Sequence, residues 1–273
     1  MCGKKSVVRI IAYCITAFLL VGIPFGYLLK ADKESVQVDI LFLGDSLIGR
    51  CRDESSVPYL VGQALGKSTF NGAFGGTTMT WYPNEKSDYY QKYGLNFPAL
   101  ANALSTGDFG VQKSLESYEP ATEDFPQVID TLARLDVEHL EIVVLEYGTN
   151  DFFAEIAIEG EVAERTLGGS FEMGISTLKE RFPHLRIVMV GPTYNWHYQT
   201  VDDSEALKFT GEKLKFYSEA IGNLCEEYQV EYIDLYDLYD HTDNMHVYTE
   251  DSVHPNSYGR ELIAKQIAGY LSK

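Results

Sequence analysis

The sequence is poor in cysteine and in positive charge, and these shortages exclude several classes of protein. It has only 4 cysteines in 273 residues, and no CxxC, HExxH or comparable spacing that would indicate a metal site. The net charge of -18 argues against nucleic acid as a partner, because phosphate binding needs a basic surface. It argues equally against docking of the folded part on anionic lipid head groups. We therefore expect no metal, no other cofactor and no nucleic acid.

Two further absences narrow the fold. No segment repeats at intervals of 20–50 residues, which argues against solenoids and propellers. No G-x-S-x-G motif occurs, which counts against the α/β-hydrolase fold proper. With 273 residues, of which 45% are hydrophobic, the chain is long enough for one globular domain with a complete core.

The N-terminal segment differs in charge from the rest of the chain. Residues 1–30 contain four basic residues and no acidic one, which leaves 22 − 4 = 18 basic and 40 acidic residues in the remainder. Residues 10–29 include no charged residue over 20 positions, enough for a helix to span a hydrocarbon core of roughly 30 Å. Lys4, Lys5 and Arg9 precede this run. By the positive-inside rule, we expect a single-pass anchor with a cytoplasmic N-terminus and an extracellular domain.

A cleaved signal peptide, and hence secretion, is the less favoured alternative. Signal peptides have apolar regions of about 7–15 residues that end in a small-x-small site. The run here is longer and ends in Tyr27-Leu28-Leu29-Lys30. Outside this segment only Cys51 and Cys225 remain, and whether they pair does not follow from the sequence. We expect residues 1–35 to form the cytoplasmic N-terminus, anchor and linker, and residues 36–273 to form one domain.

Apolar runs alternate with amphipathic segments along this domain. Strands are predicted at residues 36–43, 68–71, 141–147, 186–190 and 230–235, and helices at 58–65, 125–135, 164–181, 206–228 and 258–271. Strands that alternate with helices are typical of a parallel sheet covered on both faces. The predicted fold is therefore a three-layer α/β/α sandwich with a mostly parallel sheet.

Residues 79–127 form an aromatic-rich insertion in this pattern, with short helices predicted near residues 98–104 and 111–118. One interpretation is that its aromatic side chains pack into a small core of their own. The other is that some of them line a groove for sugars or acyl chains. Trp81 and Tyr82 are candidate substrate-binding residues on the second interpretation. His197, which follows a predicted strand, is a third candidate.

Polar breaks interrupt the pattern at four places where strands end or helices begin. Their sequences are Gly44-Asp45-Ser46-Leu47, Gly75-Gly76-Thr77, Gly148-Thr149-Asn150-Asp151 and Asp251-Ser252-Val253-His254-Pro255-Asn256. Acyl transfer needs a hydroxyl nucleophile, a base, a carboxylate that orients the base, and donors for an oxyanion. The four breaks contain each of these groups. Ser46 offers the hydroxyl, His254 the base and Asp251 the carboxylate.

The spacing of Asp251 and His254 allows the two side chains to meet on one side of a turn. Pro255 biases His254 away from helical angles and is placed to begin the next helix. The alternative is that Asp251 caps a helix and His254 lies on the surface. Asp45 and Asp151 are expected to bind backbone turns. The remaining histidines are expected in loops or on the surface: His139, His184 and His246.

These motifs resemble the conserved blocks of the GDSL, or SGNH, hydrolases. Gly44-Asp45-Ser46-Leu47 resembles block I, Asn71 with Gly76 block II, Gly148-Thr149-Asn150-Asp151 block III, and Asp251-x-x-His254-Pro255 block V. The resemblance implies a flavodoxin-like SGNH fold with Ser46 as nucleophile and Asp251 and His254 as its partners. It also implies an oxyanion hole made by the N–H groups of Ser46 and Gly76 and the Asn150 amide. Gly75 is the alternative donor, but the spacing from Asn71 favours Gly76.

The expected function is that of a serine esterase that hydrolyses a small-molecule or glycan ester through an acyl-enzyme. An extracellular location and the aromatic-rich insertion favour removal of O-acetyl groups from a glycan. An O-acyltransferase that acts on a sugar would use the same triad, and a lipase or thioesterase would need an apolar groove. A non-catalytic surface binding module is the alternative of a different class. The oligomeric state is not predicted.

Overall fold

The computed structural model describes residues 34–80, 94–115, 125–195, 204–241 and 245–273. The chain divides into two compact units, Met1–Ser35 and Val36–Lys273. The predicted anchor at residues 10–29 lies outside the described residues, as do Trp81, Tyr82 and His197. Within the described ranges, no helix has both the length and the apolar character needed to cross a membrane.

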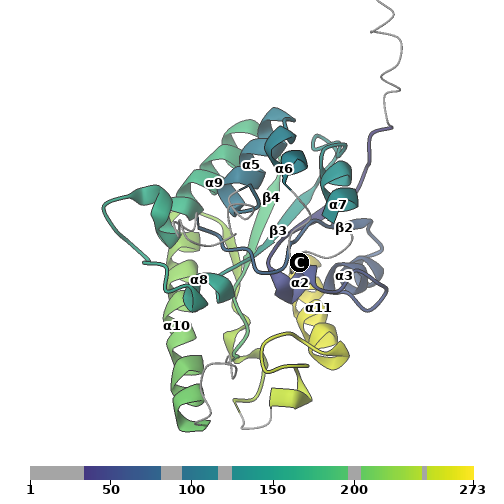
Figure 1. The fold of residues 1–273 in the computed structure, drawn as a ribbon. Coiled ribbons are helices and arrows are strands. Elements are labelled where there is room, and N and C mark those ends of the chain that lie inside the picture. Colours follow the sequence, from purple (N-terminus) through teal and green to yellow (C-terminus); the bar gives the residue numbers. More distant parts are fainter. Residues whose placement is uncertain (1–33, 81–93, 116–124, 196–203, 242–244) are drawn as a thin grey trace, which may run out of the picture. The chain divides into compact units, whose positions relative to one another are not determined.

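A five-stranded parallel sheet forms the centre of the second unit (Figure 1). Its strands lie in the order β2-β1-β3-β4-β5. Their bounds are β1 Ile40–Gly44, β2 Thr69–Asn71, β3 Ile142–Glu146, β4 Arg186–Val190 and β5 Glu231–Ile233. The described strand pairs are all parallel, and this strand order is the flavodoxin-like one. The predicted sheet is confirmed.

Two strands are shorter than predicted. β1 begins at Ile40 because Val36 makes only an isolated bridge, to Leu135. β5 has three residues because it is an edge strand that pairs only with β4. Leu235 leaves the extended conformation, with a φ of -109° and a ψ of 3°, so the pairing ends before it.

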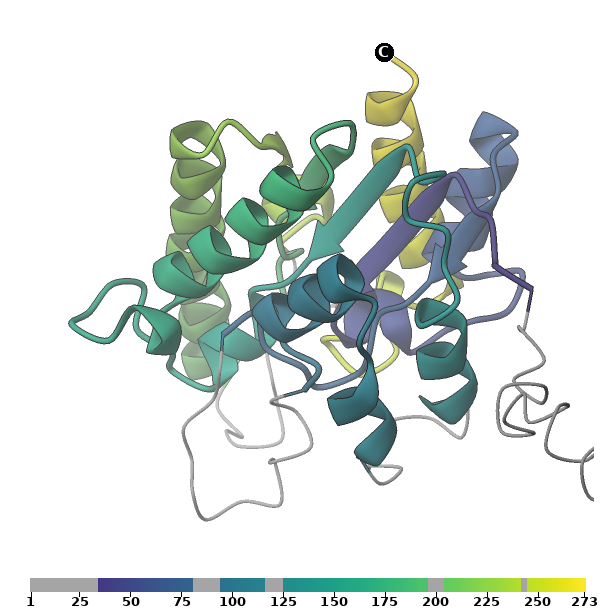
Figure 2. The ribbon, with the colours of Figure 1, turned by 90° about the horizontal axis from the view of Figure 1, so that it is seen from above.

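Side chains that alternate along the strands divide the core into two layers. Leu41, Leu43 and Val143 belong to one apolar cluster, whereas Ile40 and Phe42 belong to the other. Helices cover both clusters (Figure 2). The first face carries α5 (Phe97–Thr106), α7 (Phe125–Leu132) and α9 (Leu167–Arg181), and the second carries α3 (Val57–Leu65) and α11 (Ser257–Leu271). The three-layer sandwich predicted from the sequence is therefore present.

The long helices follow the predicted segments closely. They are α3 Val57–Leu65, α7 Phe125–Leu132, α9 Leu167–Arg181, α10 Ser204–Glu227 and α11 Ser257–Leu271. The helix expected from residue 164 is divided into η1 (Ala163–Arg165) and α9. Thr166 caps α9 by accepting a hydrogen bond from the Gly169 N–H, which separates the two.

Part of the aromatic-rich insertion joins the main core. It contributes α5 (Phe97–Thr106) and α6 (Gly110–Ser114). Phe97 is fully buried in the cluster that includes the sheet, and its ring lies 6.0 Å from that of Tyr147. The interpretation that these aromatic residues build a separate core is therefore wrong for Phe97.

Candidate active site

The polar breaks at the ends of β1 and β3 lie side by side at the carboxyl edge of the sheet. The chain leaves β1 toward β2 on one side and later returns to form β3 on the other, and sites in open α/β sheets occur at such a switch. Ser46 is the first residue of the short helix α2 (Ser46–Gly49). Asp45 caps this helix, with Oδ1 accepting a hydrogen bond from the Leu47 N–H at 2.9 Å. This cap fixes the turn that carries the Ser46 hydroxyl.

Gly44 is required where β1 and β3 approach each other just before this turn. Gly44 pairs with Glu146 in the register of the two strands. A Cβ at position 44 would lie 2.4 Å from the Glu146 carbonyl oxygen. A larger residue would therefore force the strands apart at the point that positions Ser46.

Ser46, His254 and Asp251 form a continuous chain of hydrogen bonds. Ser46 Oγ lies 2.9 Å from His254 Nε2, and His254 Nδ1 lies 2.7 Å from Asp251 Oδ2. An ionised carboxylate only accepts, so Nδ1 carries the proton and Nε2 is left to accept from the Ser46 hydroxyl. In the sequence, His254 is 208 residues from Ser46 but only 3 residues from Asp251.

A tight turn holds His254 in this position. The Glu250 N–H donates to the His254 carbonyl at 2.8 Å, and Asp251 Oδ1 accepts from the backbone N–H groups of Val253 and His254. Ser252 has a φ of 70°, a left-handed conformation that is costly for a residue other than glycine. Strain of this kind is typical of functional sites.

Pro255 does not begin the following helix. Asn256 is the N-cap of α11 and accepts a hydrogen bond from the Gly259 N–H. Pro255 instead bridges to Thr249 across the turn. The Asp251 side chain does not cap a long helix. Its Oδ1 accepts from the backbone N–H of His254, and its Oδ2 contacts the His254 imidazole.

The electrostatics of Asp251 suit a carboxylate that stays ionised. Partial burial favours the neutral acid, but the backbone N–H and the imidazole of His254 outweigh it and lower the pKa of Asp251. Asp251 is therefore a permanent acceptor for the imidazole. A negative charge at this place stabilises an imidazolium when one forms on His254.

Arg50 also contacts the triad, which sequence reasoning missed. Its Nη1 lies 3.1 Å from Asp251 Oδ2 and 2.7 Å from His254 Nδ1. Its Nη2 lies 3.7 Å from Glu250 Oε2. Arg50 follows α2 in sequence, but it meets the acids about 200 positions later only through the fold, so no local pattern could have indicated the contact.

The other proposed oxyanion donors are tied to the same corner of the sheet. Gly76 has a φ of 70°, which glycine adopts without strain. Thr77 Oγ1 donates to the carbonyl of Gly44 at 3.2 Å, which places this turn beside the end of β1. The Asn150 side-chain amide donates to the Thr77 carbonyl at 2.9 Å. That bond uses one of the two N–H groups of the amide, and no hydrogen bond of the other is seen among the described residues.

Three acidic side chains are buried behind this corner. Burial raises the pKa of Asp45 to about 7 and that of Asp151 to about 6. Burial, together with the charge of Asp45, raises the pKa of Glu146 well above its ordinary value. Asp151 accepts hydrogen bonds from the N–H groups of Met79 and Thr80. The prediction that Asp45 and Asp151 bind backbone turns is confirmed, whereas sequence reasoning missed Glu146.

Asn71, which the block II resemblance singles out, has a structural position. Its amide donates to the carbonyls of Ile48 and Cys51, at 2.9 Å and 3.0 Å. It therefore joins the end of β2 to the segment that follows Ser46. Cys51 and Cys225 are both free thiols. The three histidines predicted for loops or the surface are exposed: His139, His184 and His246.

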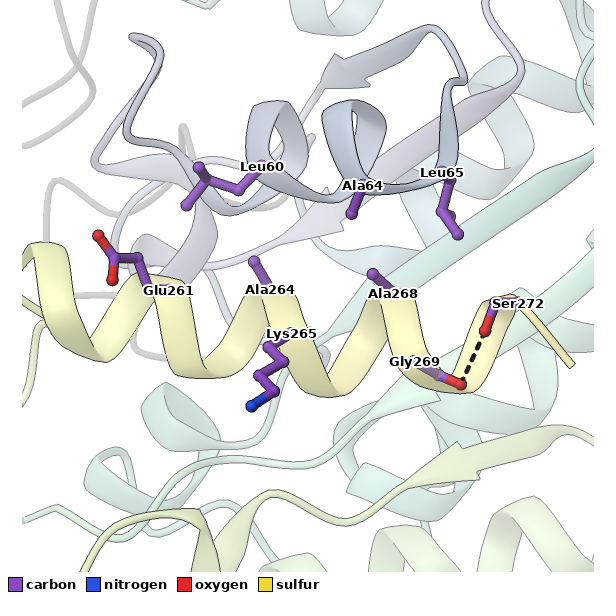
Figure 3. A pocket seen from close by; sticks show the side chains of 9 residues that line it. All are labelled: Leu60, Ala64, Leu65, Glu261, Ala264, Lys265, Ala268, Gly269 and Ser272. Carbon is purple, nitrogen blue, oxygen red and sulfur yellow. Dashed lines mark hydrogen bonds between the residues drawn. The ribbon is translucent and has the colours of Figure 1, made fainter.

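A separate apolar groove lies between α3 and α11 (Figure 3). Its volume is about 450 Å³, and Leu60, Ala64 and Leu65 of α3 face Ala264 and Ala268 of α11 across it. None of its lining residues belongs to the triad. The groove is therefore distinct from the site around Ser46.

Comparisons with known proteins identify solved structures with the same fold. Solved structures with the same fold include a carbohydrate acetylesterase, Est24, from Sinorhizobium meliloti, at 16% identity and a TM-score of 0.54 over 86% of this chain and 98% of that one. They also include an aryl esterase from M. smegmatis, at 14% identity and a TM-score of 0.55 over 86% and 98%. A putative GDSL-like lipase from Bacteroides ovatus matches at 14% identity and a TM-score of 0.52, over 87% and 99%.

At these identities the solved structures establish the fold alone. No curated protein matches the chain. The family-level evidence is the profile of the GDSL-like lipase/acylhydrolase family, which matches residues 42–262. That range is most of the chain and contains all of the polar breaks described above. The protein therefore belongs to the GDSL-like lipase/acylhydrolase family of hydrolases.

Proposed function

We propose that this protein is a serine esterase in which Ser46 is the nucleophile, His254 the general base and Asp251 the residue that orients it. Ser46 Oγ attacks the ester carbonyl carbon while His254 Nε2 takes the hydroxyl proton. The imidazolium then returns this proton to the leaving alcohol as the ester C–O bond breaks. Water attacks the resulting acyl-enzyme in the same way, which releases the acid and restores Ser46.

One observation carries this proposal: the unbroken chain from Ser46 Oγ through the imidazole to Asp251 Oδ2, with steps of 2.9 Å and 2.7 Å. Both distances are within the range for proton transfer between a nucleophile and its base. The backbone N–H groups of Ser46 and Gly76 and the amide of Asn150 are the proposed oxyanion donors. Each would contribute about 3 kcal/mol to transition-state stabilisation.

The Ser46→Ala variant of the full chain tests the proposal. We expect hydrolysis of a short aryl ester to fall by about 10³-fold or more, and a fluorophosphonate probe to label the wild type but not the variant. Ser114→Ala is the matched control, because Ser114 is an exposed serine whose hydroxyl donates to the Val111 carbonyl of its own helix. Equal turnover by wild type and Ser46→Ala would contradict the assignment. Labelling without turnover of any ester would favour the binding-module alternative.

For the substrate, we propose an O-acetyl group on a glycan, with Trp81, Tyr82 and His197 as contacts. Support comes from the aromatic residues of the insertion, because aromatic faces and a few polar groups are what a sugar site needs. One solved structure with the same fold is described as a carbohydrate acetylesterase, and this supports the proposed substrate class further.

Acetate release from acetylated glycans, compared with hydrolysis of long-chain esters, tests this substrate class. We expect Trp81→Ala and Tyr82→Ala to raise KM for the glycan ester and to leave the aryl acetate unaffected. A preference for long acyl chains would instead favour a lipase or thioesterase. Acetyl transfer to added sugar in place of release would favour an O-acyltransferase.

For the location, we propose that residues 10–29 anchor the protein in the cell membrane, with residues 36–273 outside the cell. The charge pattern of residues 1–30 supports this topology. The full chain should sediment with membranes, resist high salt and enter solution with detergent, and external protease should cleave the folded domain. A mature protein that begins near residue 31 and stays in solution would instead show secretion after cleavage.

A further inference from the structure

The loop that carries Gly76, a proposed oxyanion donor, leaves the sheet at its edge strand, β2. Past the end of β2, the N–H groups of Gly72 and Phe74 still donate to carbonyls of β1, at 2.8 Å and 2.9 Å. In an extended chain, the residues between point their backbone groups the other way. The carbonyls of Asn71 and Ala73 therefore face outward, at the edge where the described sheet ends.

Arg52 caps both of these carbonyls. Its Nη1 donates to the Asn71 carbonyl at 2.6 Å, and its Nη2 donates to the Ala73 carbonyl. The half-buried guanidinium also lies over the ring of Phe74, 5.9 Å from the ring centre. A guanidinium presents its donors as a rigid fork. One side chain therefore replaces the bonds that a neighbouring strand would make.

Two further contacts join the same parts of the chain. The Asn71 amide donates to two carbonyls of residues 48–52, the segment that bears Arg52. Within that segment, Gly49 approaches the loop so closely that a Cβ would lie 2.8 Å from the Ala73 carbonyl oxygen. We call these contacts of Arg52, Asn71 and Gly49 the clasp. The clasp joins α2, the helix of the proposed nucleophile, to the loop of the proposed oxyanion donor.

The turn that carries Gly76 starts at the end of the clasp. Thr77 donates to the Phe74 carbonyl through its N–H at 3.4 Å and through its hydroxyl at 2.8 Å. Gly75 and Gly76 therefore occupy the middle of a four-residue turn, where the φ of 70° at Gly76 suits glycine. Phe74 is both the first residue of this turn and the ring beneath the Arg52 guanidinium. A displacement of Phe74 would move the Gly76 N–H relative to the nucleophile.

We propose that Arg52 is a positioning residue that fixes the Gly76 N–H relative to Ser46 Oγ by capping the outer edge of the loop. The inference rests on the proposed esterase function. Arg52 acts through the backbone of the loop and not on the substrate. An oxyanion donor is effective only at its correct distance, and a misplacement of about 1 Å costs about 100-fold in rate. Loss of Arg52 should therefore weaken binding of the transition state more than binding of the ester.

Arg52→Met is the decisive variant, because it keeps an aliphatic stem and removes both donors. We expect kcat for an aryl acetate, per active site titrated with the fluorophosphonate probe, to fall by about 10- to 100-fold. KM should stay within about threefold. Inhibition by a small boronic acid should weaken by a factor similar to that in kcat, because its tetrahedral adduct with Ser46 places an oxygen in the oxyanion hole. Arg52→Lys keeps the charge but not the fork, and its kcat should lie between the two.

Arg186→Met is the matched control. Arg186 is also half-buried, and it joins the opposite edge strand, β5, through Glu231 and also donates to the Leu271 carbonyl. It is the first residue of β4 and so lies at the amino end of the sheet. We expect Arg186→Met to lower Tm and to leave kcat per site and boronic-acid inhibition unchanged. Wild-type values of both in Arg52→Met would overturn the proposal, and so would an equal loss of kcat per site in Arg186→Met.

Amide hydrogen exchange over residues 71–77 tests the clasp without turnover. Exchange at Gly72 and Phe74 should be faster in Arg52→Met than in the wild type, and unchanged in Arg186→Met. Unchanged exchange in Arg52→Met would overturn the inference by itself. A failure of the esterase proposal appears separately, as turnover by Ser46→Ala. If Arg52→Met does not fold, the same measurements on Arg52→Lys decide.

Discussion

Arg50 illustrates how a single exposed side chain can tune the proposed triad. Its guanidinium lies beside both Asp251 Oδ2 and His254 Nδ1, so it neutralises part of the Asp251 charge and repels an imidazolium. In Arg50→Ala the imidazolium that forms on His254 in the transition state is no longer repelled. We expect kcat/KM for a short aryl ester to rise by about twofold, a modest change because Arg50 is half exposed and its charge is screened.

The kcat/KM of wild type and Arg50→Ala, measured at neutral pH in low and high salt, checks this prediction. High salt should bring the wild-type kcat/KM toward that of Arg50→Ala. Arg181→Ala serves as the control, because Arg181 is equally exposed and forms its ion pair at the surface with Glu138. An unchanged or lower kcat/KM in Arg50→Ala would contradict the account.

Ser252 has a left-handed backbone in the turn that carries His254. At a φ of 70°, a β-branched side chain is strongly disfavoured, whereas glycine is not. We expect Ser252→Gly to change the free energy of unfolding by less than about 1 kcal/mol, because relief of strain offsets the added freedom of the unfolded chain. Ser252→Val should lose about 2 kcal/mol and most of the activity. Urea unfolding and kcat/KM of both variants test this, and a fully active Ser252→Val would refute it.

At the scale of elements, the junction of β1 and β3 matters most, because the Ser46 turn follows it directly. A Cβ at Gly44 would collide with backbone, which cannot move aside as a flexible side chain can. We expect Gly44→Ala to reduce the free energy of unfolding by about 2–3 kcal/mol. We also expect it to lower kcat by a larger factor than it changes KM. Urea unfolding and steady-state kinetics measure the two effects.

Gly269 in α11 provides a matched comparison for Gly44→Ala. A Cβ there meets nothing within 4 Å, so Gly269→Ala should stabilise the protein by about 0.5–1 kcal/mol through helix propensity. Equal effects of the two substitutions would mean that the close approach of β1 to β3 does not position the site.

The elements that the sequence predicts well are those whose signals are local. The β4 strand at Arg186–Val190 is apolar and bounded by turn residues, and its predicted limits agree with the structure. α3 has a serine cap and a proline in its first turn. β5 was overestimated because its length depends on a pairing partner, which a single strand does not show. The packing of Phe97 into the main core likewise depends on α9 and the sheet, which lie far along the chain.

The same distinction holds for the candidate site. Ser46, Asp251 and His254 could be named because each lies in a short motif with a chemical meaning, and the structure brings them within hydrogen-bond distance. Arg50 and Glu146 carry no such signal. Arg50 looks like any charged residue after a short helix, and Glu146 looks like the polar end of a buried strand. Their importance arises from neighbours that only the folded sheet supplies.

At the scale of the whole molecule, buried acids and partly exposed acids have opposite effects on how the free energy of unfolding depends on pH. Asp251, Asp39 and Glu231 have pKa values lowered by their hydrogen bonds, so their contribution is lost as the pH falls through those values. Asp45 and Asp151 have raised values of about 7 and about 6. For these two, the contribution is present in acid and is lost as the pH rises toward those values.

These opposite slopes predict that the free energy of unfolding is greatest near about pH 4 and declines toward neutral pH. The net charge of -18 at pH 7 adds repulsion that acts in the same direction and that salt weakens. The Asp151→Asn variant lacks the contribution of Asp151 to this pH dependence. Because the pKa of Asp151 rises from 3.8 to about 6, the wild type should lose about 3 kcal/mol more than the variant between about pH 4 and about pH 7.

Urea unfolding of wild type and Asp151→Asn across this range measures the difference in slope. The comparison cancels the many acids that the two proteins share, and it holds even if Asp151→Asn is less stable at every pH. A lower stability throughout is expected, because an amide can accept only one of the N–H bonds from Met79 and Thr80. Parallel curves would mean that Asp151 is already ionised in acid. The two backbone N–H groups would then outweigh burial, and the pH dependence of the fold would have to come from Asp45 and Glu146.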